Sequence, residues 1–285
     1  TTGIHPETPY LMDRRSFLKT WCFFLLAQSL PATRIVSALD APTSSTKKFP
    51  GTAPTNHHLP SAIRDIQLPN YDWPLLQSTL DRFSRIQAIV GYGNFCLLGF
   101  DDSQRVAKDY AKVGAFTQQE LEFINKLFQT NARTYGFLGD KIFHNISDTI
   151  AASKTQKLPG TGNYLFKGLP QQIYHQISRD IGDRVVLTAG IRGMSKQFYL
   201  FLRKVKKTGG NLSLASQAIA PPGYSYHGVG DFDVGQVGFG VANFTTRFSH
   251  TPVYKKMTQL DYVVFRYPQN NRLGVQFEPW HIQVV

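Results

Sequence analysis

The sequence Pro-Gly-Tyr-Ser-Tyr-His-Gly-Val-Gly-Asp-Phe-Asp-Val-Gly occupies residues 222–235 and decides how the rest of the chain is interpreted. It combines one histidine, two carboxylates and four glycines. A second segment, Phe-Glu-Pro-Trp-His at 277–281, adds another histidine and another carboxylate. A catalytic zinc site takes three protein ligands, leaves one position for water and places a carboxylate beside that water. The two segments therefore predict one metal site that the remaining chain holds together.

The spacing within the second segment carries a structural expectation. Glu278 and His281 lie three residues apart, so their side chains would point to opposite faces of a regular strand. For both to serve one metal, the backbone must bend between them. Pro279 favours such a break because it cannot donate to a sheet ladder. We expect Trp280 to pack away from the metal.

The composition is typical of a globular protein with a substantial core. The chain has 285 residues, of which 42% are hydrophobic and 13% aromatic, enough for one large domain or two small ones. Its net charge of +12 would suit an anionic partner, but the densest basic run, at 203–207, has no nucleic-acid-binding motif beside it. We therefore expect a solvated basic surface and no nucleic-acid partner. The only cysteines, Cys22 and Cys96, exclude a disulfide framework and a cysteine-based metal site.

The N-terminal residues predict export followed by a linker. Residues 13–19, Asp-Arg-Arg-Ser-Phe-Leu-Lys, resemble a twin-arginine export signal, and a short apolar stretch and the small residues Val-Ser-Ala at 36–38 follow. We expect residues 1–38 to be this signal peptide with its upstream residues; an uncleaved membrane anchor is the alternative. Residues 39–70 are rich in Pro, Ser and Thr and predict a flexible linker. The mature chain would then have no stable membrane span and would work in the periplasm or cell envelope.

Hydrophobic periodicity predicts several helices in the middle of the chain. Apolar residues recur at helical spacing from Trp73 to Val90, and Thr117 with Glu120 forms a capping box at the start of a second helix. Further helices are expected at 142–152, 170–181 and 196–205, the last of them capped by Ser195, and a short strand at 94–100. Other strands are expected around 185, 225–234, 262–266 and 275–283.

These elements predict an α+β fold. A small antiparallel sheet within residues 181–285 would carry the metal site, and a helical region at 71–180 would pack on and around it. Because no linker separates the two regions, we expect them to form one unit. Arg192 follows the strand at 185–188 and stands between Gly190 and Gly193. This position favours a side chain that reaches into a cleft.

Three motifs in this order resemble one known family. They are Ala-Gly-Ile-Arg-Gly at 189–193 with Gln197 downstream, Pro-Gly-Tyr-Ser-Tyr-His at 222–227 with Gly230 and Asp233, and Glu-Pro-Trp-His at 278–281. Together they are similar to the D-alanyl-D-alanine carboxypeptidase family of zinc metallopeptidases (VanY-like, LAS type). That family has the pattern Ser-x-His-x-x-Gly-x-Ala-x-Asp, followed by Glu-x-x-His. The resemblance covers roughly residues 184–285.

The resemblance implies a role for each matching residue. The implied Zn²⁺ ligands are His227, Asp233 and His281. Glu278 would be the general base, and Arg192 would contact the substrate and stabilise the developing oxyanion. Contacts with the substrate are also implied for Ser225, Gln197 and Tyr226.

The sequence departs from the family pattern at one point. The family separates its first histidine and its aspartate by seven positions, whereas His227 and Asp233 are six apart. A one-residue deletion in a continuous strand would turn a side chain to the opposite face, but Gly228 and Gly230 can absorb the change as a bulge or turn. Asp233 is followed by an apolar residue and a glycine, as in the family, so we prefer it as the ligand. Asp231 is the alternative.

The resemblance implies an exported zinc peptidase that acts on the stem peptides of peptidoglycan, in the first place a D-alanyl-D-alanine carboxypeptidase. An endopeptidase that cuts L,D or D,D bonds of the same polymer is an alternative. A second alternative is a catalytically silent zinc-fold binding protein, for which the six-residue spacing leaves room, although such a binder would have no use for Glu278. A third is a binder of anionic polymers that acts through charge alone. The sequence does not predict the oligomeric state.

Overall fold

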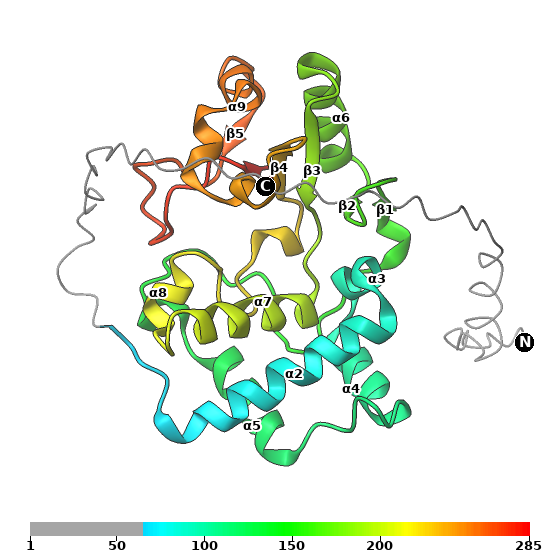
Figure 1. Cartoon of the computed structure of the whole chain (residues 1–285), viewed down its shortest axis with the longest axis vertical. Helices are drawn as coiled ribbons and strands as arrows, with labels where there is room; N and C mark the ends of the chain where they lie inside the picture. Colours follow the sequence, from blue (N-terminus) through cyan, green and yellow to red (C-terminus); the bar gives the residue numbers. More distant parts are fainter. Residues whose placement is uncertain (1–64) are drawn as a thin grey trace, which may run out of the picture. The chain divides into compact units, whose positions relative to one another are not determined.

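The computed structural model describes residues 65–285 (Figure 1). The export signal predicted at 1–38 and most of the linker predicted at 39–70 lie outside these residues. The last positions of that linker are packed: the amide of Ile66 donates to Ser213 Oγ (3.1 Å), and the amide of Leu68 donates to the Gly210 carbonyl (2.8 Å). Leu68 is also buried. The chain is therefore anchored to the folded part from Ile66 onward.

Helices make up most of the first part of the described chain, and short strands carry the second. The α-helices are α2 (Trp73–Val90), α3 (Tyr92–Leu97), α4 (Phe100–Asp109), α5 (Gln118–Gln129), α6 (Leu169–Ile181), α7 (Met194–Lys207), α8 (Leu212–Ser216) and α9 (Pro252–Met257). The strands are β1 (Thr155–Lys157), β2 (Tyr164–Phe166), β3 (Val185–Ala189), β4 (Phe232–Gln236), β5 (Val264–Phe265) and β6 (His281–Gln283). Short 3₁₀ helices are η1 (Asn70–Asp72), η2 (Ala132–Tyr135), η3 (Ala152–Lys154), η4 (Tyr226–Gly228), η5 (Gly240–Phe244) and η6 (Thr246–His250).

The two helices with the clearest sequence signals form where they were expected. Helix α2 has the bounds that its apolar periodicity predicts, and it ends at Gly91, whose φ of +81° lies in the region that favours glycine. Helix α5 begins with the predicted capping box. The Glu120 amide donates to the Thr117 hydroxyl (3.1 Å), and the Thr117 amide donates to the Glu120 carboxylate (2.9 Å). The helix at 170–181 and the strand that begins at Val185 are confirmed as α6 and β3.

A first hydrophobic cluster joins the helices. Helix α2 packs along α7, and Phe83 of α2 stacks on Phe198 of α7 with ring centroids 6.0 Å apart. Both rings are fully buried, as is Phe201 of α7. Figure 1 shows α2, α4 and α5 in one half of the described part, with α7 between them and the sheet. Helix α7 thus packs on the helical layer and begins two residues after Arg192, which follows β3.

A second hydrophobic cluster lies at the sheet. The four-stranded sheet has the order β3-β4-β6-β5, and every pairing in it is antiparallel. Helices α6 and α9 pack beside it, and their side chains share a core with Phe232, Val234 and Ile282 of the strands. Strands β1 and β2 form a separate hairpin. The expected α+β class, with a small antiparallel sheet packed by helices, is confirmed.

Several local predictions are wrong. The strand expected at 225–234 begins only at Phe232, because the 3₁₀ helix η4 and a turn precede it. Residues 94–100 form the end of α3 and the start of α4, not a strand, and Gly99 stands between the two short helices. Residues 142–152 do not form a helix, because the Asp148 carboxylate accepts from the amides of His144 and Asn145 and stabilises a local turn. Ser195 does not cap its helix: α7 begins at Met194 after Gly193, and the Ser195 hydroxyl donates to the Gly99 carbonyl (2.9 Å).

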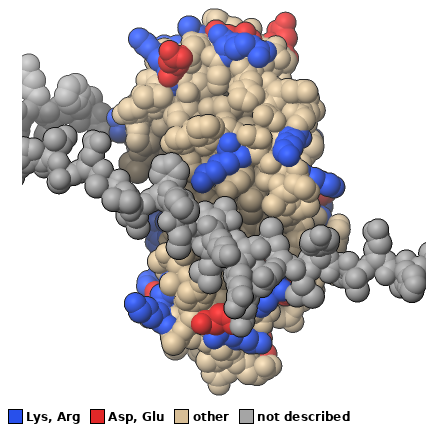
Figure 2. All heavy atoms as spheres, turned by 90° about the vertical axis from the view of Figure 1, so that its right-hand side faces the viewer, with Lys and Arg blue, Asp and Glu red and all other residues tan. Residues whose placement is uncertain are grey.

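Where the described residues are visible in Figure 2, the surface shows no concentration of charge of one sign. There the Lys and Arg side chains stand in separate groups with Asp and Glu near several of them. Among residues 65–285, no helix is long and apolar enough to cross a membrane. Cys96, in the same part of the chain, is buried and makes no disulfide.

Candidate metal centre

Three elements meet at one end of the sheet and bring the predicted ligands together. His227 lies in η4, Asp233 is the second residue of β4, and His281 is the first residue of β6. Asp233 and His281 are direct partners in the antiparallel ladder between β4 and β6. A register shift between Leu187 and Ala189 of β3, opposite Asp233, turns the following segment toward the same point.

The six-residue spacing is accommodated as the sequence suggested. Gly228 ends η4, and Gly230 has a φ of +153°, so the chain turns before β4 begins at Phe232. The deletion relative to the family pattern therefore falls in a turn and does not rotate the strand. Asp233 keeps its side chain on the face that meets both histidines.

The three ligand atoms lie close together. Asp233 Oδ1 is 3.3 Å from His227 Nε2 and 3.3 Å from His281 Nδ1. One ligand atom from each residue falls within 4.8 Å of the others, and all three side chains are buried. A tetrahedral zinc ion with bonds of about 2.0–2.2 Å would keep its ligands roughly 3.3–3.5 Å apart. The spacing fits a divalent cation such as zinc.

Two of these atoms also lack any hydrogen-bond partner. Among the described residues, His227 Nε2 and Asp233 Oδ1 are buried polar atoms without a partner. Buried polar atoms are hydrogen-bonded in the great majority of cases, and each exception calls for an explanation. A cation bound between them would supply the missing interaction for both atoms.

The opposite nitrogen of each imidazole is held by a hydrogen bond. His227 Nδ1 donates to the Gly190 carbonyl (2.7 Å), which leaves Nε2 to face Asp233. His281 Nε2 donates to Asp231 Oδ2 (3.0 Å), which leaves Nδ1 to face Asp233 and Glu278. Metal-binding histidines are typically oriented in this way by a second hydrogen bond.

Gly190 is required at its position by packing as well as by this hydrogen bond. A Cβ atom there would lie 2.0 Å from the backbone carbonyl oxygen of Tyr164, far inside van der Waals contact. The glycine lets the end of β3 pass close to β2, so its carbonyl reaches His227.

Burial and the neighbouring charges set the protonation of the first two ligands. Burial, together with the charge of Arg192, lowers the pKa of His227 to about 4, so its imidazole is neutral at physiological pH. Burial alone would raise the pKa of Asp233, but His227 and Arg192 hold it well below its usual range. Arg192 Nη2 donates to Asp233 Oδ2 at 2.6 Å. A neutral imidazole and an ionised carboxylate are the forms that bind a metal.

The third ligand and the proposed base behave differently. Burial would lower the pKa of His281, but its contacts with Asp231 and Glu278 outweigh burial and raise the pKa to about 9. A cation that binds at Nδ1 must therefore displace a proton. Burial raises the pKa of Glu278, as expected for a carboxylate that accepts and returns a proton.

The bend predicted between Glu278 and His281 is present. The His281 amide donates to the Glu278 carbonyl (3.2 Å), which closes a turn through Pro279 and Trp280 before β6 begins. The turn places Glu278 Oε2 3.4 Å from His281 Nδ1. Trp280 packs into the second hydrophobic cluster, away from the ligands as expected.

A small cavity opens over these residues. Its volume is about 20 Å³, and Arg192, Ser225, Tyr226 and Glu278 line it together with both histidines. Such a volume holds roughly one ordered water. Apolar and aromatic side chains complete its wall, from Ala218–Ala220, Tyr267 and Val275.

The structure places Gln197 apart from this cavity. Gln197 is buried, its side-chain amide donates to the Arg192 carbonyl (2.8 Å), and its side-chain oxygen accepts from the Gly223 amide (2.9 Å). Both polar atoms therefore connect two backbone segments of the site. The substrate contact expected for Gln197 has no support in this geometry, because its polar groups are occupied inside the protein.

Asp231 does not stand among the ligand atoms. It lies on the far side of the His281 ring, where it accepts the Nε2 proton and pairs with Arg266. The group of ligand atoms therefore contains Asp233 and not Asp231, as the sequence favoured. Sequence reasoning missed Arg266 and Tyr267, which lies against His281 with ring centroids 4.8 Å apart. Their only signal is their place directly after β5, the strand that pairs with the end of the chain.

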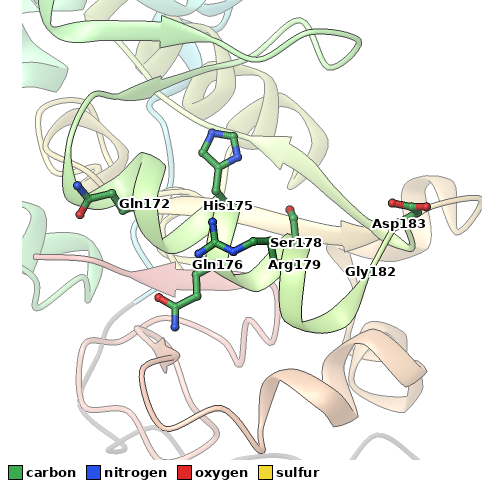
Figure 3. A pocket seen from close by; sticks show the side chains of 7 residues that line it. All are labelled: Gln172, His175, Gln176, Ser178, Arg179, Gly182 and Asp183. Atoms are coloured by element: carbon green, nitrogen blue, oxygen red, sulfur yellow. The ribbon is translucent and has the colours of Figure 1, made fainter.

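A larger hollow in the described part lies elsewhere. It has a volume of about 640 Å³ and lies along α6 and the turn that follows, from Gln172 to Asp183. Figure 3 shows that Gln172, His175 and Gln176 point in different directions. The side chains do not converge on one point, and none of the predicted site residues lines this hollow.

Comparison with known proteins finds a family match over the region that contains this site. Residues 171–285 match the family described as VanY: D-alanyl-D-alanine carboxypeptidase, and every predicted site residue lies inside the match. No curated protein matches the chain significantly.

Several solved structures are similar at low identity. A mutant of the vancomycin-resistance D,D-pentapeptidase VanY in complex with Zn(II) is 23% identical, with 47% of this chain and 81% of that chain covered and a TM-score of 0.35. The LD-carboxypeptidase LdcB is 22% identical over 52% of this chain and 66% of its own, with a TM-score of 0.38. VanYB in complex with D-alanine-D-alanine is 25% identical over 50% and 85%, with a TM-score of 0.36. Residues 171–285 are thus similar to the VanY D-alanyl-D-alanine carboxypeptidase family, and the three motifs and the candidate ligand geometry lie inside this match.

Proposed function

We propose that this protein is a zinc-dependent D,D-carboxypeptidase that removes the terminal D-alanine from peptidoglycan stem peptides. One observation carries the proposal: the partnerless atoms of His227 and Asp233 converge with His281 Nδ1 at one buried point beside Glu278. The family match supports the substrate class.

The donor set favours a catalytic site over a structural one. A structural zinc site usually has four protein ligands, whereas the described residues supply three at this point. A carboxylate and a cavity of about 20 Å³ occupy the remaining side. When bound, zinc would act as a Lewis acid that lowers the pKa of a water from ~16 toward ~7 and polarises the scissile carbonyl.

Glu278 is the candidate general base. It lines the cavity, and its raised pKa suits a group that takes a proton from the attacking water and returns it to the leaving amine. The turn at Pro279 fixes its carboxylate next to His281.

Arg192 is the candidate oxyanion donor. It lines the cavity and uses Nη2 to bind Asp233, and within residues 65–285 its Nη1 and Nε make no hydrogen bond. Guanidinium donors that face the cavity can stabilise negative charge on the carbonyl oxygen as the tetrahedral centre forms. The same side chain therefore holds a metal ligand and contacts the reacting group. Ser225 and Tyr226 line the cavity and are the candidate contacts for the peptide.

The decisive assay uses purified muropeptides with pentapeptide stems and mass spectrometry of the products. The zinc-loaded protein is expected to release one terminal alanine, and Glu278→Gln is expected to release it far more slowly. Two larger fragments would instead identify an endopeptidase. Binding without cleavage by the zinc-loaded wild type would identify a silent binding protein.

We further propose that the chain is exported through the twin-arginine pathway. The supporting observation is the Arg-Arg-Ser-Phe-Leu-Lys sequence at 14–19, followed by an apolar stretch. Replacing Arg14 and Arg15 by lysine in the full chain should retain the protein in the cytoplasm, as measured by cell fractionation. Unchanged export of that variant would contradict the proposal.

A further inference from the structure

Asp231 has an unusual environment for a residue that supplies none of the three candidate ligand atoms. Its side chain is fully buried, and each of its oxygens accepts two hydrogen bonds. Oδ2 accepts from His281 Nε2 (3.0 Å) and from Arg266 Nε. Oδ1 accepts from Arg266 Nη2 (3.1 Å) and from the Val284 amide (2.9 Å). No lone pair is left to bind a cation. Asp231 can therefore act on the site only through its hydrogen bond with His281.

We propose that Asp231 is the positioning residue of the zinc site and that Arg266 fixes it in place. This inference rests on the proposed zinc function. Because Asp231 accepts the Nε2 proton of His281, the neutral ring must present an unprotonated Nδ1 to the ligand point. A carboxylate at this position also increases the electron donation of the imidazole, as outer partners of metal-binding histidines do.

Arg266 is itself held from several sides. Its side chain is buried, its guanidinium lies 3.8 Å from the centroid of the Tyr226 ring, and the Tyr226 hydroxyl donates to Asp140 (3.1 Å). The backbone amide of Arg266 donates to the His281 carbonyl (3.2 Å). The backbone of Arg266, directly after β5, is thus bonded to the residue whose ring its side chain orients through Asp231. A fork-shaped guanidinium on a carboxylate gives two fixed directions, which a lysine cannot reproduce.

The two histidine ligands differ in this respect. His227 donates to a neutral backbone carbonyl, that of Gly190, whereas His281 donates to an ionised and fully paired carboxylate. The position of His281 at the end of the segment 278–281 explains why its ring needs the stronger hydrogen bond. It follows a turn and begins a strand of only three residues, so the local backbone alone fixes its ring weakly.

The test is the zinc affinity of Asp231→Asn, measured by competition with a chromogenic chelator. Asparagine keeps the shape, but its amide can turn an N–H toward His281 and favour the tautomer with the proton on Nδ1. Zinc affinity should fall about 10–100-fold. Arg266→Lys, which keeps the charge and loses the fork, should cause a smaller loss.

Glu120→Gln is the matched control. Glu120 is a buried carboxylate paired with Arg82, a partly buried arginine, in the helical layer. Its loss should destabilise the protein without changing zinc affinity. If Asp231→Asn and Glu120→Gln both leave zinc affinity at the wild-type value, Asp231 has no positioning role.

A measurement on the wild type covers the case in which Asp231→Asn does not fold. Long-range ¹H–¹⁵N NMR of the zinc-loaded protein should show His281 with a protonated Nε2 and a metal-bound Nδ1. A His281 that binds zinc through Nε2 would overturn the proposal. Wild-type protein that binds no zinc would instead refute the proposed function, and the two failures are thus distinguished.

Discussion

Two buried carboxylates show how the helical layer and the edge of the sheet differ. In the helical layer, Glu120 accepts from Arg82 Nε (3.0 Å) and Nη2 (3.2 Å) and from the Thr117 amide (2.9 Å), so both its oxygens are paired. At the sheet, Asp233 pairs one oxygen with Arg192 and leaves the other between two imidazoles. In the folded protein both oxygens of Glu120 have hydrogen-bond partners, whereas Oδ1 of Asp233 has none among the described residues. Such a local exception is expected where a protein binds a ligand.

The largest effect, on both zinc binding and activity, should come from replacing the carboxylate of Asp233. Asp233→Asn removes the ligand charge and weakens the pair with Arg192, so stoichiometric zinc and peptidase activity should both be lost. Zinc content by elemental mass spectrometry and muropeptide hydrolysis would measure the two losses. Full zinc content in this variant would show that Asp233 is not a ligand.

Removal of the base should separate chemistry from metal binding. Glu278→Gln should lower kcat/KM by about 10²–10⁴-fold, the usual contribution of a general acid–base group, while one zinc per chain is retained. Steady-state kinetics on a pentapeptide muropeptide would give the rate. A variant that hydrolyses as fast as the wild type would exclude Glu278 as the base.

The matching change in the helical layer should affect stability alone. Glu120→Gln leaves the partly buried Arg82 without its charge partner, and loss of one partner of a buried pair costs about 3–5 kcal/mol. Urea unfolding of the zinc-loaded protein would measure this loss. Altered zinc affinity in Glu120→Gln would mean that the two regions are coupled.

The same carboxylate predicts how stability depends on pH. Burial opposes ionisation of Glu120, but its hydrogen bonds with Arg82 and Thr117 lower its pKa below the ordinary 4.5. A lowered folded-state pKa stabilises the fold above the unfolded value and loses that contribution as pH falls through the folded value. The stability difference between wild type and Glu120→Gln should therefore shrink as the pH is lowered below about 4.5. A difference that stayed constant from pH 6 to pH 3 would contradict this assignment.

A smaller effect is expected at the glycine that supports His227. Gly190→Ala would place a Cβ 2.0 Å from the Tyr164 carbonyl oxygen and shift the Gly190 carbonyl away from the imidazole. Overpacking of this kind costs about 1–3 kcal/mol. Thermal unfolding should show the loss, and zinc affinity should fall with it. Equal melting temperatures for variant and wild type would show that the strand end can move without cost.

The comparison also explains which features the sequence could predict. Local signals were sufficient for α2 and for the capping box of α5, because each depends on residues within one or two turns. The motif order and the glycines around His227 were sufficient to predict which three side chains the structure brings together. The turn at Pro279 followed from the need of Glu278 and His281 to face one metal.

Features set by distant partners could not be predicted in this way. The short helices at 92–97 and 100–109 replaced an expected strand because their apolar side chains pack on α2 and α7. Gln197 lies in the motif but bonds to two backbone segments of the site. The contact of Arg266 with Asp231 joins residues 35 positions apart, and no local pattern indicates it.

Zinc content of the purified wild-type protein, measured after dialysis against metal-free buffer and alongside its muropeptide hydrolysis, tests the metal centre most directly. We predict one zinc per chain and activity that is lost with a strong chelator and restored by zinc. A metal-free sample that still removes alanine from pentapeptide stems would contradict the metal centre formed by His227, Asp233 and His281.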